Sequence, residues 1–174
     1  MIRLVPIGER VGLETLDGLA AALAIRFDDS CHVHPEAVDT SFAFDAARRQ
    51  YHSTAILAHL DRTFPDDRVL GITAVDLFVP IFTFVFGEAQ ISGRCALVST
   101  HRLRQEFYGL PPDRHLVDER LLKEAVHELG HTAGLRHCQD WTCVMTSSHS
   151  IDRLDLKSPD FCPACRPPVH QSPK

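Results

Sequence analysis

The segment HELGHTAGLRH, residues 127–137, constrains the fold of this chain more than any other feature. His127 and His131 are four residues apart, so they share one face of a helix, and their imidazoles can bind one ion. His137 cannot reach that ion from the same helix, because the further residues turn it to another face. The chain must therefore bend, and Gly134 is the residue that tolerates a positive φ at a helix end.

This segment predicts a catalytic zinc site. Three neutral nitrogens on a tetrahedral zinc leave one position open for water, which distinguishes a catalytic site from a closed structural one. Zinc lowers the pKa of that water toward about 7, and Glu128 can accept its proton as the water attacks a polarised carbonyl. The predicted reaction is amide hydrolysis, with His127, His131 and His137 as zinc ligands. Glu128 would act as general base and then as proton donor to the leaving amine.

The pattern HExxHxxGxxH resembles the zinc signature of the metzincin metallopeptidases. The resemblance implies a downstream turn that places a methionine beneath the three histidines. Met145 is the candidate, since the sequence has two methionines and the other is Met1. Some metzincins carry a tyrosine two residues after this methionine, whereas this chain has Ser147. Stabilisation of the oxyanion would then come from zinc or from another group.

Four cysteines follow the third histidine, and they are Cys138, Cys143, Cys162 and Cys165. The arrangement HExxHxxGxxHCx4CxM followed by CxxC resembles the archaemetzincin family. In that family the four thiolates hold a second zinc, so the resemblance implies two Zn²⁺ per chain, one catalytic and one structural. This chain has sixteen residues between the methionine and the CxxC, one fewer than the family pattern.

Disulfide formation is the alternative for these thiols, with a bridge from Cys138 to Cys143. No secretory leader is expected, since residues 1–8 are already strand-like and the apolar stretch 13–25 contains two acidic residues. We therefore expect a cytoplasmic protein, in which clustered thiols bind metal more often than each other. No apolar run reaches the roughly 18 residues of a membrane span, so no membrane partner is expected.

Composition and charge narrow the other partners. The chain has 174 residues, of which 44% are apolar and 24% charged, as in an ordinary globular domain. Its formal net charge of −5 disfavours nucleic acid. We expect one domain over 1–174, with an upper subdomain at 1–134, a lower subdomain at 135–166 and a flexible tail at 167–174. Nothing in the sequence indicates an oligomer, and a monomer is assumed.

Alternating strand-like and helical patterns predict an α/β fold. Strands are expected at 2–7, 31–34, 69–75, 82–90 and 95–99, and helices at 13–27, at 44–64 and from Asp113 or Asp118 through the histidine motif. The βαβαβ order implies parallel strands with right-handed crossovers. The metzincin resemblance implies a twisted mixed sheet, mostly parallel with an antiparallel edge strand. It also implies packed helices, an active-site helix and a small zinc-stapled C-terminal lobe.

The metzincin resemblance further suggests that the strand at 82–90 lies over the cleft and binds an extended peptide through its backbone. The predicted contact residues are Phe86, Gly87, Glu88 and Ala89. Gly87 would let the substrate backbone come close. An ordinary sheet edge is the alternative.

The leading hypothesis is a zinc metallopeptidase of the endopeptidase or aminopeptidase type, acting on peptide or protein. The alternative is a zinc-binding peptide-recognition protein with little or no turnover. Glu128 argues against that alternative, because a binding protein has no use for a base beside an open metal position. A nucleic-acid-binding zinc protein depends on the CxxC alone and is disfavoured by the acidic charge.

Overall fold

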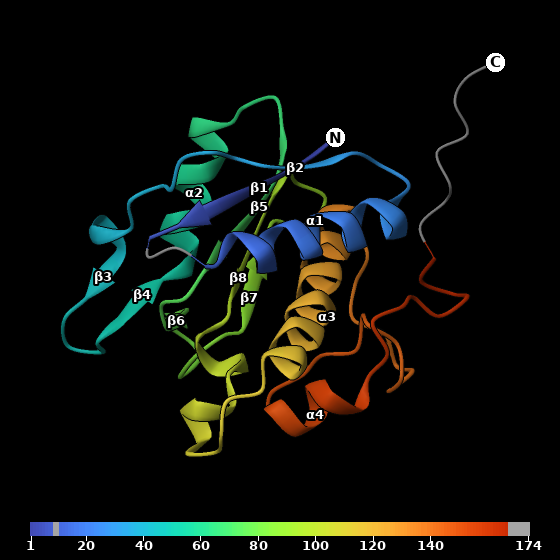
Figure 1. The fold of residues 1–174 in the computed structure, drawn as a ribbon. Coiled ribbons are helices and arrows are strands. Elements are labelled where there is room, and N and C mark those ends of the chain that lie inside the picture. The colour runs from blue at the N-terminus through green and yellow to red at the C-terminus, as the bar shows by residue number, and fades with distance from the viewer. Residues whose placement is uncertain (9–10, 167–174) are drawn as a thin grey trace.

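A five-stranded sheet organises the fold (Figure 1), with the strand order β2-β1-β5-β8-β7. The strands are β1 (Ile2–Ile7), β2 (Cys31–Val33), β5 (Arg68–Thr73), β7 (Gly87–Ala89) and β8 (Cys95–Ser99). Neighbouring strands pair in parallel from β2 to β8, and β7 pairs with β8 in the antiparallel direction. This confirms the predicted mixed sheet with an antiparallel edge strand. The computed structural model describes residues 1–8 and 11–166, so the predicted tail at 167–174 lies outside the described residues.

Alternating side chains give the sheet two apolar faces, each covered by helices. On one face, Leu4 and Val98 pack in a cluster with residues of α1 (Leu13–Phe27) and α3 (Arg114–Thr132). On the other face, Val5 and Leu97 pack with residues of α2 (Ser53–Thr63). The layered α/β class predicted from the sequence is therefore confirmed, with α3 lying along the β7 and β8 end of the sheet (Figure 1).

The predicted start of the second helix at residue 44 is wrong. That helix begins at Ser53, and the residues before it form a hairpin that joins a second, three-stranded sheet. Its strands are β3 (Phe44–Asp45), β4 (Gln50–His52) and β6 (Leu77–Phe78). The Asp45 carboxylate accepts hydrogen bonds from the backbone N–H groups of Ala47 and Arg48, and Arg49 has a positive φ of 56°. Such local side-chain bonds favour a turn over a helix.

The segment after α3 returns beside that helix (Figure 1) and contains a short helix that the sequence did not predict, α4 (Ile151–Leu156). Val144, Met145 and Leu154 from this segment are fully buried in the same cluster as α3. The residues after α3, 135–166, are called the lower segment below, and they contribute to the core. Among the described residues, no helix is both long enough and apolar enough to cross a membrane.

Candidate metal centres

The helix α3 carries the first two histidines of the motif. Asp113, one of the two predicted caps, is the N-cap of this helix. Its carboxylate accepts a hydrogen bond from the backbone N–H of Leu116 at 3.0 Å. The helix ends at Thr132, and Gly134 has a positive φ of 88°. The predicted bend after the helix is therefore present, and it turns the chain back toward α3.

This bend brings His127, His131 and His137 together. One ring nitrogen of each lies within 4.8 Å of the others. The ring centroids of His127 and His137 are 5.4 Å apart, and those of His131 and His137 are 5.0 Å apart. The Nε2 atoms of His127 and His131 lie 3.1 Å apart. The three imidazoles thus face one small volume, as the spacing predicts.

The hydrogen bonds of two of these rings determine which nitrogen carries the proton. Nδ1 of His127 lies 2.8 Å from the carbonyl oxygen of Val144, and Nδ1 of His131 lies 2.8 Å from that of Leu135. A carbonyl oxygen only accepts, so each Nδ1 is the donor and each Nε2 presents a lone pair. Two lone pairs at 3.1 Å repel each other unless a cation lies between them. The donor set therefore fits a metal ion, and neutral imidazole suits zinc.

The environment favours the neutral form of His127 and of His137. Burial lowers the pKa of His127 well below its ordinary value, and the charge of Lys157 adds to that effect. Burial also lowers the pKa of His137, with a further contribution from His131. Neutral imidazole is the form that binds a metal ion, so burial favours the ligand form of both residues.

Glu128 is on α3, and its side chain lies against Gly87 of the edge strand β7. Its side chain is buried, and burial raises its pKa well above the ordinary value, with a further contribution from the charge of Glu124. A Cβ atom added at Gly87 would lie 2.9 Å from both Cγ and Oε1 of Glu128. Gly87 therefore makes room for Glu128, which is a different role from the close substrate approach that the sequence suggests. The sequence separation of the two residues hides this contact.

Met145 is fully buried against α3. A Cβ atom added at Gly130 would lie 2.5 Å from its sulfur, so Gly130 leaves the space that the methionine fills. Sequence reasoning missed Gly130, although a glycine between two histidines on a buried helix face was a signal of close packing. The methionine predicted for the turn therefore packs against the helix that carries the first two histidines.

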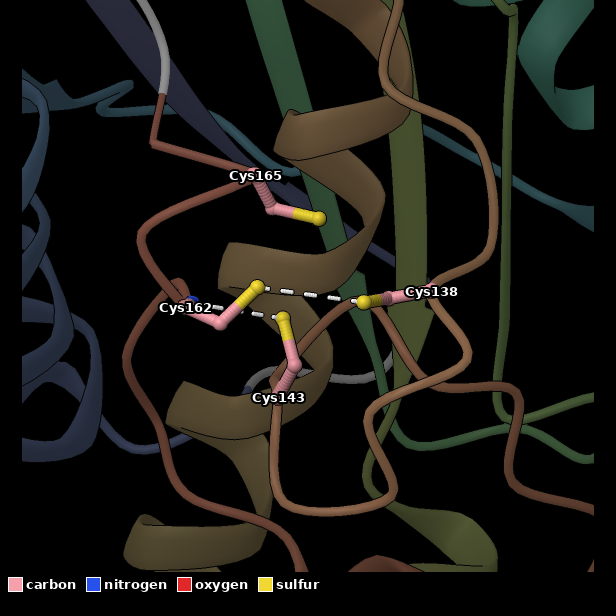
Figure 2. A group of neighbouring side chains, drawn as sticks. All are labelled: Cys138, Cys143, Cys162 and Cys165. Carbon is pink, nitrogen blue, oxygen red and sulfur yellow. Dashed lines mark hydrogen bonds between the residues drawn. The ribbon is translucent and has the colours of Figure 1, made fainter.

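The four cysteines after the third histidine form a second cluster (Figure 2), with their sulfur atoms within 4.8 Å of one another. All four are free thiols, which argues against the alternative bridge from Cys138 to Cys143. Backbone N–H groups of Asp140, Met145 and Cys162 each donate to a sulfur atom of the cluster at 3.4 Å. Four sulfurs with N–H donors around them are the donor set of a closed zinc site.

The edge strand β7 is shorter than the predicted range 82–90. The carbonyl oxygen of Phe86 accepts a hydrogen bond from the N–H of Ser99 at 2.8 Å. The N–H of Gln90 donates to the carbonyl oxygen of Cys95 at 3.0 Å. Because bonded positions alternate along an antiparallel pair, the backbone groups of Gly87 and Ala89 face the open edge.

The other two predicted contact residues of this strand point elsewhere. The side chain of Phe86 is buried in the core, and the carboxylate of Glu88 accepts hydrogen bonds from Ser53 and Thr54 at the start of α2. Of the four predicted residues, only Gly87 and Ala89 keep backbone groups free for an added strand.

The sequence and the fold are similar to those of known proteins. The model of peptidase family M54 matches residues 31–171. An archaemetzincin of Methanocaldococcus jannaschii is 45% identical over 135 residues, which cover 78% of this chain and 74% of that relative. One from Archaeoglobus fulgidus is 39% identical over 156 residues, covering 89% and 91%.

Two solved structures have a similar fold. A zinc-dependent peptidase from Methanocorpusculum labreanum has a TM-score of 0.87 at 30% identity, covering 95% of this chain and 98% of that one. The structure of the Archaeoglobus fulgidus archaemetzincin, solved with malonate, has a TM-score of 0.82 at 38% identity, with the same two coverages.

Proposed function

Because the chain belongs to peptidase family M54, the archaemetzincins, we propose that it is a zinc metallopeptidase that cleaves peptide bonds at the three-histidine centre. The observation that carries this proposal is the pair of Nε2 lone pairs of His127 and His131, 3.1 Å apart with both Nδ1 atoms bound to carbonyls. Such a pair is stabilised by a cation, and a zinc ion held by three histidines would leave a position for water or substrate.

The protein residues divide the work of hydrolysis. Bound zinc supplies a Lewis acid that polarises the scissile carbonyl and acidifies water. Glu128 accepts a proton from the attacking water, and the raised pKa that burial gives its carboxyl suits a group that must hold this proton. It then gives the proton to the leaving amine. His127, His131 and His137 would hold the metal ion, and Met145 packs against Gly130, which lies between the first two on α3.

The substrate is proposed to bind as an extra strand along β7. The backbone groups of Gly87 and Ala89 on the open edge support this mode, since a peptide pairs with such an edge through main-chain hydrogen bonds. The cleft would then lie between an upper subdomain, 1–134, and a lower one, 135–166. Mapping the products of a peptide library distinguishes an endopeptidase from an aminopeptidase. The cytoplasmic location and the monomeric state remain predictions.

Substituting Gly87 by Ala is expected to lower kcat by about 10- to 100-fold, because the new methyl group displaces the Glu128 carboxyl that lies 2.9 Å from it. Steady-state cleavage of one peptide measures the change. Gly18→Ala is the matched control, since an added Cβ at Gly18 meets nothing within 4 Å. In a Glu128→Gln background the loss should shrink. A full loss there would instead indicate that β7 is displaced from β8, because the carbonyl oxygen of Leu97 on β8 lies 2.7 Å from the same Cβ position.

The second zinc is proposed at Cys138, Cys143, Cys162 and Cys165, which support it by their convergence within 4.8 Å. Metal analysis of the purified protein should therefore return two zinc ions per chain. His127→Ala should return one, because it removes a ligand of the histidine site only. A single zinc that survives His127→Ala but disappears in Cys162→Ser would contradict the two-site proposal.

The alternative of a zinc-binding recognition protein without turnover is tested by the same library. A protein of that kind would bind extended peptides and leave them intact at every metal loading. Zinc-dependent cleavage that a chelator abolishes would support the peptidase.

A further inference from the structure

A buried lysine links the lower segment to the active-site helix. The side chain of Lys157 has no exposed surface, and its Nζ donates to Oε1 of Glu124 at 3.1 Å and to the carbonyl oxygen of Thr146 at 3.3 Å. Glu124 lies on α3 and its side chain is 5% exposed. A buried ion pair of this kind adds little stability compared with apolar residues of the same size. Its position in the structure therefore suggests another role.

The pair holds the turn that contains Met145. The carbonyl before Met145, that of Val144, is bound by Nδ1 of His127 at 2.8 Å. The carbonyl after it, that of Thr146, is bound by Lys157. Both carbonyls that flank the methionine are thus tied to α3, one directly and one through Lys157 and Glu124. Glu124 is three residues before His127 on that helix, so the two attachments are about one turn apart.

This arrangement connects Lys157 to a metal ligand. The orientation of the His127 ring depends on the Val144 carbonyl, and the place of that carbonyl depends on the turn. On the basis of the proposed function, we propose that Lys157 is a positioning residue. Through Glu124 and Thr146 it fixes the methionine turn and thereby the ligand geometry of His127. Among the described residues, Lys157 makes no hydrogen bond to a histidine of the centre or to β7.

Other charged residues join the lower segment to α3 without reaching the turn. Arg120 binds the Asp155 carboxylate with two hydrogen bonds of 2.6 Å. Lys123 donates to the Asp155 carbonyl at 3.1 Å and pairs with Glu119 at 2.7 Å. These contacts hold α4 against α3. They provide a control that separates docking of the lower segment from positioning of the turn.

The test uses Lys157→Met combined with Glu124→Leu in the full chain. The double change avoids a buried unpaired charge, so the chain keeps its fold, but the bond to Thr146 is lost. Lys123→Met is the matched control, because Lys123 is also buried on α3 but makes no contact with the turn. Titration with Co²⁺, after a chelator has emptied the histidine site and with zinc kept in the four-cysteine cluster, measures affinity through the part of the visible absorption that His127→Ala removes. We expect about 10- to 100-fold weaker binding in the double variant and no change in the control.

Amide hydrogen exchange of the zinc-loaded proteins gives a second readout. The N–H of Thr146 donates to the carbonyl oxygen of Cys143, and the N–H of Cys138 donates to that of Met145, each at 3.0 Å. Both should exchange faster in the double variant and at the wild-type rate in Lys123→Met.

Each outcome of the two measurements has one meaning. Wild-type Co²⁺ affinity in the double variant would overturn the positioning role. An equal loss of affinity in Lys123→Met would overturn it too, since docking of the segment would then explain the effect. If the wild type shows no absorption that depends on His127, the proposed function fails, and the inference fails with it.

Discussion

Replacing Glu128 by Gln is expected to lower kcat/KM for peptide cleavage by about 100- to 10,000-fold. Gln has the same shape as Glu, so it fits the space that Gly87 leaves, 2.9 Å from the Glu128 side chain. It cannot accept the proton of the attacking water. The loss should therefore appear in kcat, with the zinc content of the wild type retained and the melting temperature unchanged or raised, because a neutral group replaces a buried carboxyl.

The control for this substitution is Glu119→Gln, which makes the same chemical change on an exposed position of α3. Glu119 pairs with Lys123 at 2.7 Å, and a partly exposed pair of this kind contributes little. Its kcat/KM should match the wild type. Full cleavage by Glu128→Gln, with two zinc ions bound, would show that another group is the base. Normal peptide binding without any cleavage in the wild type would favour the recognition protein instead.

The sequence predicts the convergence of the three histidines because their geometry is local. Histidines four residues apart share a helix face, and Gly134 marks the bend that brings His137 back, so spacing alone determines which rings converge. The parallel strands were also predictable, since β1 and β5 are short buried runs separated by helical periodicity. The start of α2 was not predictable. The apolar spacing over residues 44–64 favours a longer helix, but hydrogen bonds to the Asp45 side chain form a turn there instead.

Contacts between distant residues explain the rest of what the sequence did not reveal. The sequence predicts a substrate contact at Gly87 and gives no sign that its neighbour in space is Glu128 from another element. Nothing in the sequence around Lys157 indicates that its side chain is buried. Its burial depends on Glu124, 33 residues earlier, and no periodicity connects the two. Pairings of this type require the packed lower segment, which local patterns do not describe.

Replacing Cys165 by Ser is expected to weaken the catalytic centre without changing any of its ligands. The change removes one sulfur from the four-cysteine cluster, so the lower segment would lose the proposed zinc site that holds its ends together. His137 precedes Cys138 directly, and the N–H of Cys138 donates to the carbonyl of Met145 at 3.0 Å. Displacement of Cys138 therefore moves both a zinc ligand and the methionine turn.

The expected size of this effect is about 10- to 100-fold in the affinity of the histidine site for metal, with a matching loss of cleavage at limiting zinc. Competition with a chelator measures the affinity, and metal analysis at saturating zinc should return one ion per chain. Cys31→Ser is the control, because Cys31 is a free thiol on β2 that is not part of the cluster. Unchanged affinity in Cys165→Ser would show that the turn is held from the α3 side alone, through His127 and Lys157. Cys165→Ser can also be combined with the Lys157→Met and Glu124→Leu changes. If the combination lowers the metal affinity further than Cys165→Ser alone, the turn is held from both sides.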